Sequence, residues 1–331
     1  MSAPCLIADV GGTNARFALC EPGRPPGPAV SLYTADFPGL AEAIDEAQRV
    51  LGARAGAAAL AVAGPVAGDR VSLTNHDWTF STRTIAARFG FAPLIVVNDF
   101  AALAWALPGL AGDALEPLGG GTPRAGAAKV ALGPGTGLGV AALVPVPEPH
   151  RGPAGDGWAA VAGEGGHATL AAGDDFEAAL IASLRRRLGH VSCEAVLSGP
   201  GLVRLHTAVV EVAGAAEAVA DPEAPSGPED VSRLAAEEPG GPAGQAVAVF
   251  CRLLGGYAGD LALTFGARGG VYLAGGILPA LGELFDHDGF RRRFEDKGRF
   301  AGYMATVPAF VIRAPQPALD GLSALLAREM P

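Results

Sequence analysis

The chain has 331 residues, of which half are hydrophobic and 18% are charged, and its formal net charge is −10. This length predicts one large domain or two smaller ones, and the apolar content can supply a sizeable core. The acidic balance argues against a nucleic-acid partner, because nucleic-acid binding needs a basic face. A polyanionic ligand would instead need backbone N–H groups, a helix N-terminus or a divalent metal.

The cysteines and the apolar stretches bear on the cellular compartment. No C-x-x-C spacing occurs, so we expect four free thiols in a reducing compartment. The first residues lack the basic and apolar regions of a signal peptide. Residues 246–265 are strongly apolar but contain Arg252 and Asp260, which predicts a buried core helix rather than a membrane span. We therefore expect a cytoplasmic protein with no membrane partner.

The first hundred residues predict alternating strands and helices. Residues 6–10 and 16–20 are apolar runs on either side of a Gly-Gly-Thr-Asn turn, which predicts a hairpin. The elements predicted next are a strand within 26–36, a helix over 39–52, two strands within 57–75, a helix over 81–90, a strand over 93–98 and a helix over 101–107 that Pro108 ends. This order indicates an α/β domain.

The pattern begins again after a Gly/Pro-rich stretch near 109–126. Residues 129–145 repeat strand, Gly-Thr turn and strand, and Gly12-Thr13 aligns with Gly135-Thr136. This weak internal repeat suggests a duplicated architecture. We expect a small domain formed by 1–108 and about 315–331, and a large domain formed by about 109–314. Helices are predicted at 174–188, 244–265 and 315–329, and the Ala/Pro-rich stretch 211–243 lies outside all motifs.

The two glycine turns have an ordinary and a functional interpretation. No lysine follows the first, so it is not a Walker A loop, and "GPGTGLG" fails the G-x-G-x-x-G pattern and lies between two strands. Both could be plain hairpin turns in which glycine supplies positive φ. The alternative is a pair of backbone N–H nests that hold phosphate without lysine. In the second turn Pro134 removes one potential donor.

Three acidic or amide residues stand where predicted strands end. Asp9 lies beside the first turn, where a carboxylate would be repelled by phosphate unless a cation such as Mg²⁺ lies between them. Asp9 could also simply cap the turn. Asn98 and Asp99 follow a buried strand, at the sheet edge where α/β proteins bind ligands. Asp99 could act as a general base with Asn98 beside it, or either could cap the next helix.

A third group of candidates is polar and lies in the second half. "GEGGH" places Glu164 and His167 among glycines that permit close approach of backbone to a ligand. Zinc binding lacks a second histidine nearby, and hydrogen bonding to a polyhydroxylated ligand fits these side chains better. Glu194 would be a further acceptor. Each of the three could instead have only a local structural role.

Six motifs together resemble bacterial ATP-dependent glucokinases, which belong to the sugar kinase, hexokinase and actin-like ATPase superfamily. They occur in the family's order from about residue 6 to the last helix: "DVGGTNARFAL", "NDFAALAWALP", "GPGTGLGV", "GEGGH", "CEAVLSGPGL" and "LAGGILP". The cysteine-rich zinc motif of the related repressor-and-kinase branch is absent, so the resemblance is to the zinc-free branch. It implies an α/β, ribonuclease H-like duplicated fold with two domains around a deep cleft.

The resemblance also implies roles for matching residues. It implies that Asp99 is the base for the 6-hydroxyl of glucose, and that Asn98, Glu164, His167 and Glu194 bind sugar hydroxyls. The implied ATP and Mg²⁺ contacts, with Asp9 reaching the metal through water, are Ala8, Asp9, Val10, Gly11, Gly12, Thr13, Gly135, Thr136, Gly137, Gly275 and Gly276.

Other functions remain open at this point. The substrate could be another hexose or an N-acyl amino sugar, since one hydroxyl or methylene decides such specificity. The donor could be ADP or polyphosphate. A non-catalytic sugar sensor on the same scaffold is a further alternative, although it would not need Asp9, Asp99 and both glycine turns together. A homodimer is the expected assembly.

Overall fold

A computed structural model describes residues 4–74, 76–147, 157–214 and 225–330. The chain divides into two compact units. The first contains residues 1–114, 141–162 and 314–331, and the second contains 115–140 and 163–313. The sequence placed 141–162 in the large domain, whereas this division assigns them to the first unit. Ala141 and Leu143 pack there with Trp105 and Leu325.

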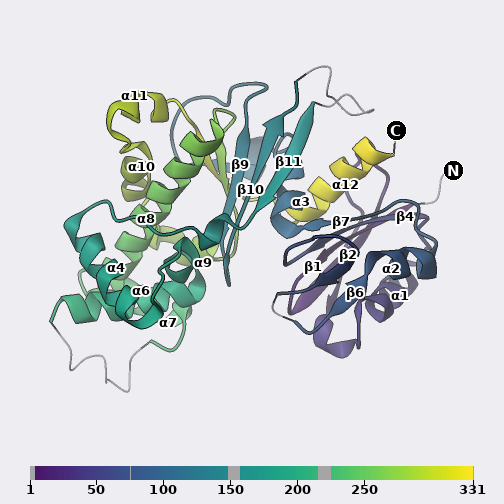
Figure 1. The fold of residues 1–331 in the computed structure, drawn as a ribbon, viewed down its shortest axis with the longest axis horizontal. Coiled ribbons are helices and arrows are strands. Elements are labelled where there is room, and N and C mark those ends of the chain that lie inside the picture. Colours follow the sequence, from purple (N-terminus) through teal and green to yellow (C-terminus); the bar gives the residue numbers. More distant parts are fainter. Residues whose placement is uncertain (1–3, 75, 148–156, 215–224, 331) are drawn as a thin grey trace. The chain divides into compact units, whose positions relative to one another are not determined.

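The first unit is built on a five-stranded sheet with the order β3-β2-β1-β4-β7 (Figure 1). Its strands are β1 (Cys5–Val10), β2 (Asn14–Cys20), β3 (Val30–Tyr33), β4 (Ala57–Val62) and β7 (Leu94–Asn98). β1 and β2 form the predicted antiparallel hairpin, and β4 lies parallel to both β1 and β7. The carboxyl ends of β1, β4 and β7 therefore meet at one edge. β5 (Arg70–Ser72) and β6 (Thr79–Ser81) form a separate small ribbon.

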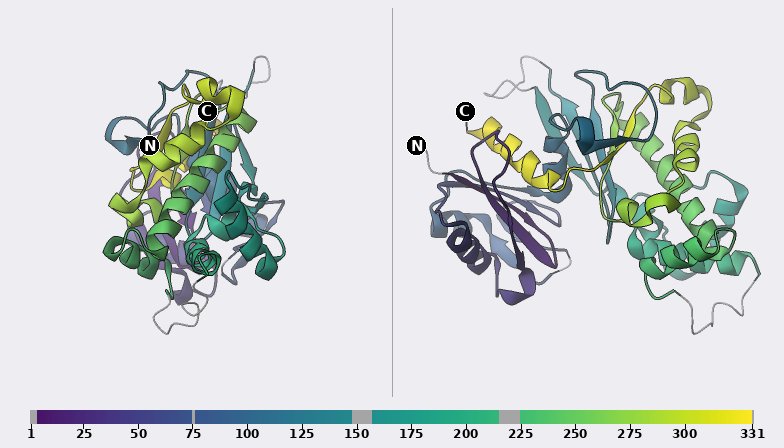
Figure 2. Two further views of the ribbon diagram at one scale, coloured as in Figure 1. Left: turned by 90° about the vertical axis from the view of Figure 1, so that its left-hand side faces the viewer. Right: turned by 180° about the vertical axis from the view of Figure 1, so that it is seen from behind.

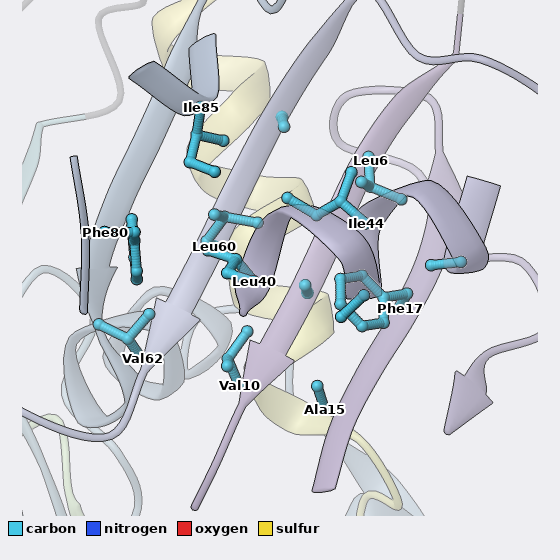
Figure 3. Packing of buried hydrophobic residues seen from close by; sticks show 14 of the residues in the cluster. Leu6, Val10, Ala15, Phe17, Leu40, Ile44, Leu60, Val62, Phe80 and Ile85 are labelled. Atoms are coloured by element: carbon cyan, nitrogen blue, oxygen red, sulfur yellow. The ribbon is translucent and has the colours of Figure 1, made fainter. Parts of the chain in front are cut away.

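Helices cover both faces of this sheet. Alternate β1 residues Leu6, Ala8 and Val10 face a core formed with α1 (Leu40–Leu51) and α2 (Thr82–Phe89), shown in Figure 3. Cys5 and Ile7 face the opposite core, formed with α3 (Asp99–Ala106) and α12 (Pro317–Glu329). Asp9 shares this parity, so its side chain lies on the face that α3 covers.

Several helix ends follow the signals in the sequence. Ser81 caps α2 by accepting a hydrogen bond from the N–H of Thr84. Gly52 and Gly90 lie in the left-handed region directly after α1 and α2, with φ of 71° and 70°. A residue with a side chain is strained there, which explains glycine at both positions.

The second sheet has six strands in the order β11-β10-β9-β12-β13-β8. They are β8 (Leu115–Pro117), β9 (Lys129–Pro134), β10 (Leu138–Pro145), β11 (Trp158–Gly163), β12 (Val271–Leu273) and β13 (Ala309–Ile312). β9 and β10 correspond to β1 and β2, and the parallel strands β12 and β13 correspond to β4 and β7. The weak repeat in the sequence is thus a repeat of strand order.

Most of β10 and β11 belongs to the first unit by this division, and apart from the other strands of the sheet the second unit is mainly helical (Figure 2). Its helices are α4 (Asp175–Leu188), α5 (Cys193–Val196), α6 (Gly199–Val212), α7 (Pro228–Glu237), α8 (Pro242–Phe265), α9 (Ile277–Leu281), α10 (His287–Glu295) and α11 (Ala301–Met304). In the described part of the chain, α8 alone is long and apolar enough to cross a membrane, and 72% of that window is buried. This agrees with the predicted core helix. Residue 75 and, within the Ala/Pro-rich stretch, 215–224 lie outside the described residues.

Candidate functional site

The first glycine turn joins β1 to β2 and is held through its carbonyl groups. Thr34, which is 1% exposed, donates its hydroxyl to the Gly12 oxygen at 2.7 Å and its N–H to the Thr13 oxygen at 3.0 Å. The N–H of Gly11 donates to the Asn14 oxygen at 3.0 Å. The N–H groups of Gly12 and Thr13 have no acceptor among the residues that the structure describes. These two donors are therefore available to an anion.

The second turn, between β9 and β10, is held differently. The N–H of Gly199 donates to the Gly135 oxygen at 2.8 Å. The carboxylate of Glu194 accepts from the N–H of Leu138 at 2.8 Å. Within the described ranges, the N–H groups of Thr136 and Gly137 find no acceptor. Each turn thus presents two unpaired backbone donors, which is the arrangement that the nest interpretation requires.

The glycines of these turns are not there for positive φ. Gly11, Gly135 and Gly137 all lie outside the left-handed region. A Cβ on Gly137 would stand 2.5 Å from the Glu194 Oε2 atom, and one on Gly11 would stand 3.3 Å from the Asn14 oxygen. A side chain at either position would crowd a neighbouring group, and positive φ, the feature that the plain hairpin interpretation invokes, is absent at both.

Two predicted nucleotide contacts, Ala8 and Val10, are fully buried in the sheet core. Their backbone is paired with both β2 and β4. Any contribution of these two residues to a ligand is therefore limited to positioning Asp9 and the turn.

Asp9 has a partner that the sequence analysis did not identify. It lies directly opposite Arg16 in the β1–β2 ladder, and Arg16 Nη1 stands 3.5 Å from Asp9 Oδ2. The two side chains are 28% and 49% exposed. Burial raises the pKa of Asp9, and the charge of Arg16 opposes this rise. Counting the register outward from the turn would have found the pair, since the hairpin fixes which residues are opposite.

Asn98 and Asp99 begin α3 at the carboxyl edge of the first sheet. Asn98 is the N-cap, and its Oδ1 accepts from the N–H groups of Phe100 and Ala101 at 2.9 and 3.3 Å. Its amide donates to the Gly64 oxygen at 3.2 Å. The capping alternative therefore holds for Asn98, whose amide retains one further hydrogen to donate.

Asp99 has a strongly raised pKa. Burial raises its pKa to about 6, the N–H of Phe100 opposes this rise, and the negative charge of Asp9 adds to it. The sheet explains the coupling, because β1 and β7 flank β4 and their carboxyl ends, where Asp9 and Asp99 stand, meet at one edge. A carboxyl group with a pKa near neutrality suits general acid–base catalysis.

The polar candidates of the second unit are partly brought together. His167 Nδ1 lies 3.9 Å from Glu194 Oε1, with side chains that are 62% and 33% exposed. Glu194 thus connects the second glycine turn with "GEGGH". Glu164 is exposed and precedes the short 3₁₀ helix Gly165–His167. These three side chains could donate to and accept from the hydroxyl groups of a ligand.

Gly275 and Gly276 follow β12 and differ in environment. Gly275 has φ of 90°, and a Cβ there would stand 2.2 Å from the Pro134 oxygen. The absence of a side chain at Gly275 therefore allows its backbone to lie against Pro134, at the start of the second turn. No atom of the described residues lies within 4 Å of a Cβ built on Gly276, so the space beside that residue is open.

The candidates form two groups, one in each unit. Asp9, Asn98, Asp99 and the first turn belong to the first unit. The second turn, Glu164, His167, Glu194 and Gly275–Gly276 belong to the second. Among the described residues, no group of three His, Cys, Asp or Glu side chains could hold a metal ion by itself.

Comparison with known proteins gives one consistent result. The sequence model of the glucokinase family matches residues 6–329. A glucokinase from Aromatoleum aromaticum is 47% identical over 326 residues, which are 98% of this chain and 94% of that one. A bifunctional protein from Paraburkholderia xenovorans is 45% identical over 99% of this chain, which spans only 49% of that protein.

A solved structure agrees with these sequence relatives. The crystal structure of a glucokinase from an Antarctic psychrotroph has a TM-score of 0.86 and 35% identity, and covers 98% of this chain and 99% of that one. The repeated strand order of the two sheets is that of an actin-like ATPase fold. The chain therefore belongs to the glucokinase family.

Proposed function

We propose that this protein transfers the terminal phosphoryl group of ATP to the 6-hydroxyl of D-glucose, with Asp99 as the general base. The oxygen of the hydroxyl forms a bond to phosphorus, the bond from phosphorus to the β-phosphate oxygen breaks, and Asp99 takes the hydroxyl proton. The products are glucose 6-phosphate and ADP.

One observation carries the assignment of the base. Asp99 combines a pKa of about 6 with a position at the carboxyl edge of the sheet, beside a second acid. It is ionised above pH 6 and can accept a proton at physiological pH. Phosphoryl transfer is governed by positioning and charge neutralisation, so one oriented carboxylate is enough as the proton acceptor.

The glycine turns supply donors to the phosphates in this proposal. Gly12 and Thr13 in one unit, and Thr136 and Gly137 in the other, offer N–H groups that no described residue accepts. Backbone donors hold phosphate oxygens without adding a mobile cation. Gly276, with open space at its Cβ position, would face the nucleoside.

The residues present also fit a magnesium ion that enters with the nucleotide. Mg²⁺ commonly binds through one or two carboxylates together with phosphates and water. Asp9 offers such a carboxylate, and it is partly exposed and coupled electrostatically to Asp99. Bound Mg²⁺ would neutralise phosphate charge. Arg16 balances the charge of Asp9 when the nucleotide is absent.

Sugar recognition is assigned to Asn98, Glu164, His167 and Glu194. Asn98 has one amide hydrogen left beyond its capping role, and His167 and Glu194 already stand close to each other. A sensor without catalysis would not need Asp99 poised as a base, so we favour the enzyme over that alternative. We also propose that the enzyme is a cytoplasmic homodimer. Its four cysteines are buried and free, which suits a reducing compartment.

The test is a sugar panel with Mg-ATP that follows ADP release, run on the wild type and on Asp99→Asn. The variant should lose at least about a thousandfold in turnover, because no side chain replaces the proton acceptor. Glucose binding measured by calorimetry should change little. Asp113→Asn, an exposed aspartate of the same unit, is the matched control and should behave as the wild type.

Each outcome has a distinct meaning. Full activity in Asp99→Asn would remove Asp99 as the base. Activity with a different hexose alone would overturn the substrate and keep the mechanism. Glucose binding without ADP release, followed by turnover with ADP or polyphosphate, would change the donor.

A further inference from the structure

The hydroxyl of Tyr257 ends on the loop that carries Glu164 and His167. It donates a hydrogen bond of 2.6 Å to the Gly165 oxygen, between the two candidate sugar ligands. Tyr257 comes from α8, 92 residues further along the chain, and it is 8% exposed. We propose that Tyr257 is a positioning residue that fixes this loop for glucose binding. The inference rests on the proposed sugar-binding role of Glu164 and His167.

The loop leaves no space for an alternative arrangement beside Tyr257. A Cβ on Gly165 would stand 2.9 Å from the Tyr257 hydroxyl and 3.1 Å from the Val140 Cβ atom. A Cβ on Gly166 would stand 2.2 Å from the Leu138 oxygen. The two glycines therefore let the loop backbone lie against β10. The spacing of "GEGGH" reflects this packing as well as any ligand.

The Gly165 oxygen is the point where the loop is anchored. It accepts from Tyr257 and also from the N–H of Ala168 at 2.9 Å. The second bond closes the 3₁₀ turn that carries His167, and the first ties that turn to α8. Loss of the tyrosine hydroxyl would leave the turn closed but no longer tied to α8.

The helix that carries Tyr257 is itself firmly placed. Cβ atoms on Gly255 and Gly259 would stand 2.1 and 2.6 Å from the backbone oxygens of Phe290 and Phe294, so α8 and α10 are in backbone contact. The two helices run beside each other in Figures 1 and 2. Lys297 also donates to the Gly256 oxygen at 2.9 Å and to Asp260 at 2.7 Å. Through its hydroxyl, Tyr257 therefore holds the loop in a fixed position relative to α8.

A polar cavity of about 270 Å³ borders the same tyrosine. Tyr257, Thr169, Asp260 and Lys297 are among the residues that line it. If the hydroxyl is removed, water from this polar cavity can occupy the space that it leaves. The free energy of unfolding should then fall little, whereas the loop loses the hydrogen bond that ties it to α8. A positioning role would therefore change glucose binding with little change in stability, whereas a purely structural role would change stability.

The experiment replaces Tyr257 with phenylalanine, which keeps the ring and removes the hydroxyl. The KM for glucose should rise roughly three- to tenfold, as expected for one net hydrogen bond. The kcat and the KM for ATP should stay within about twofold, because Asp99 and the phosphate-binding turns are untouched. Tyr272→Phe is the matched control. Tyr272 is a buried tyrosine of the same unit, and its hydroxyl donates to the Gly269 oxygen at 2.9 Å.

The outcomes are decisive in both directions. A rise in the glucose KM that is confined to Tyr257→Phe supports the positioning role. An unchanged KM overturns it, and so does an equal rise in Tyr272→Phe, which would indicate general loosening. Calorimetric titration with glucose gives the same decision from the dissociation constant. Failure of the proposed function would appear in the wild type, as absent glucose binding or turnover, whereas failure of this inference would appear only in the variant.

Discussion

The two glycine turns occupy the same place in two sheets of the same strand order, yet they are held by different parts of the chain. The first is fixed by Thr34, 22 residues away, and the second by Glu194, 56 residues from Leu138. The strands before them also differ. When the two repeats are aligned on their glycine turns, Asp9 of β1 corresponds to Leu132 of β9, which is fully buried. Two similar folds therefore carry different chemistry.

The same contrast appears where the third parallel strand of each sheet ends. β7 leads into Asp99, whereas β13 leads into Arg313, which pairs with Glu116. Both acids that suit magnesium and proton transfer thus belong to the first unit. The second unit holds the second pair of backbone donors and the candidate sugar-binding side chains. The two sheets share a strand order and a glycine turn at the same place, and the charged residues distinguish the two halves.

Replacement of Asp9 tests this comparison most directly. Asp9→Asn makes the first turn resemble the second in charge. We expect turnover to fall at least about a hundredfold, or about 3 kcal/mol in transition-state stabilisation, and the Mg²⁺ concentration needed for half-maximal rate to rise. The negative charge of Asp9 raises the pKa of Asp99, so the acid limb of the residual pH–rate profile should move to lower pH. If the acid limb stays at the same pH, the charge of Asp9 does not raise the pKa of Asp99.

Asp99→Asn should stabilise the folded protein while it abolishes turnover. The folded pKa of about 6 exceeds the ordinary value of 3.8, so ionisation of Asp99 opposes folding. This penalty is absent below about pH 3.8, grows between pH 3.8 and 6, and is complete above pH 6. We expect a gain of up to about 3 kcal/mol at pH 7.5. Urea unfolding at pH 7.5 and pH 4 checks it, and equal gains at both values would contradict the cause.

A side chain on Gly137 should disturb the second turn specifically. In Gly137→Ala the new Cβ would meet Glu194 Oε2 at 2.5 Å and displace it from the N–H of Leu138. We expect a loss of about 1–2 kcal/mol in unfolding free energy, with higher KM values for both glucose and ATP. Gly302→Ala is the control, since no atom in the described part of the chain lies within 4 Å of its Cβ position. Wild-type kinetics in Gly137→Ala would show that Glu194 can move freely.

Removal of the Thr34 hydroxyl should have the smallest effect. Thr34→Val keeps the buried shape but withdraws the donor from the Gly12 oxygen, which should lower stability by about 1 kcal/mol. The KM for ATP should rise by less than tenfold, because the Thr34 N–H still holds the Thr13 oxygen. Thr207→Val, which loses only a bond to its own helix, is the comparison. Identical results for the two variants would mean that the turn does not depend on Thr34.

The sequence predicted more about the elements than about their partners. The hairpin on each side of Gly11–Thr13, the cap at Ser81 and the helix ends at Gly52 and Gly90 are all where local patterns indicated. Arg16, Thr34 and Tyr257 were not among the candidates. Each acts through a contact with a group on another element, and hydrophobic periodicity gives no information on such contacts.

The sequence by itself determined the α/β class, the glycine turns and the acids at the strand ends, because these depend on local propensity and on the order of short motifs. The tertiary structure decided that Asn98 caps α3, that Arg16 pairs with Asp9 and that Glu194 supports the second turn. It also decided the pKa of Asp99, since burial and the charge of Asp9 act only once β1 and β7 lie on either side of β4. Electrostatic coupling depends on distance in space, which the chain acquires only by folding.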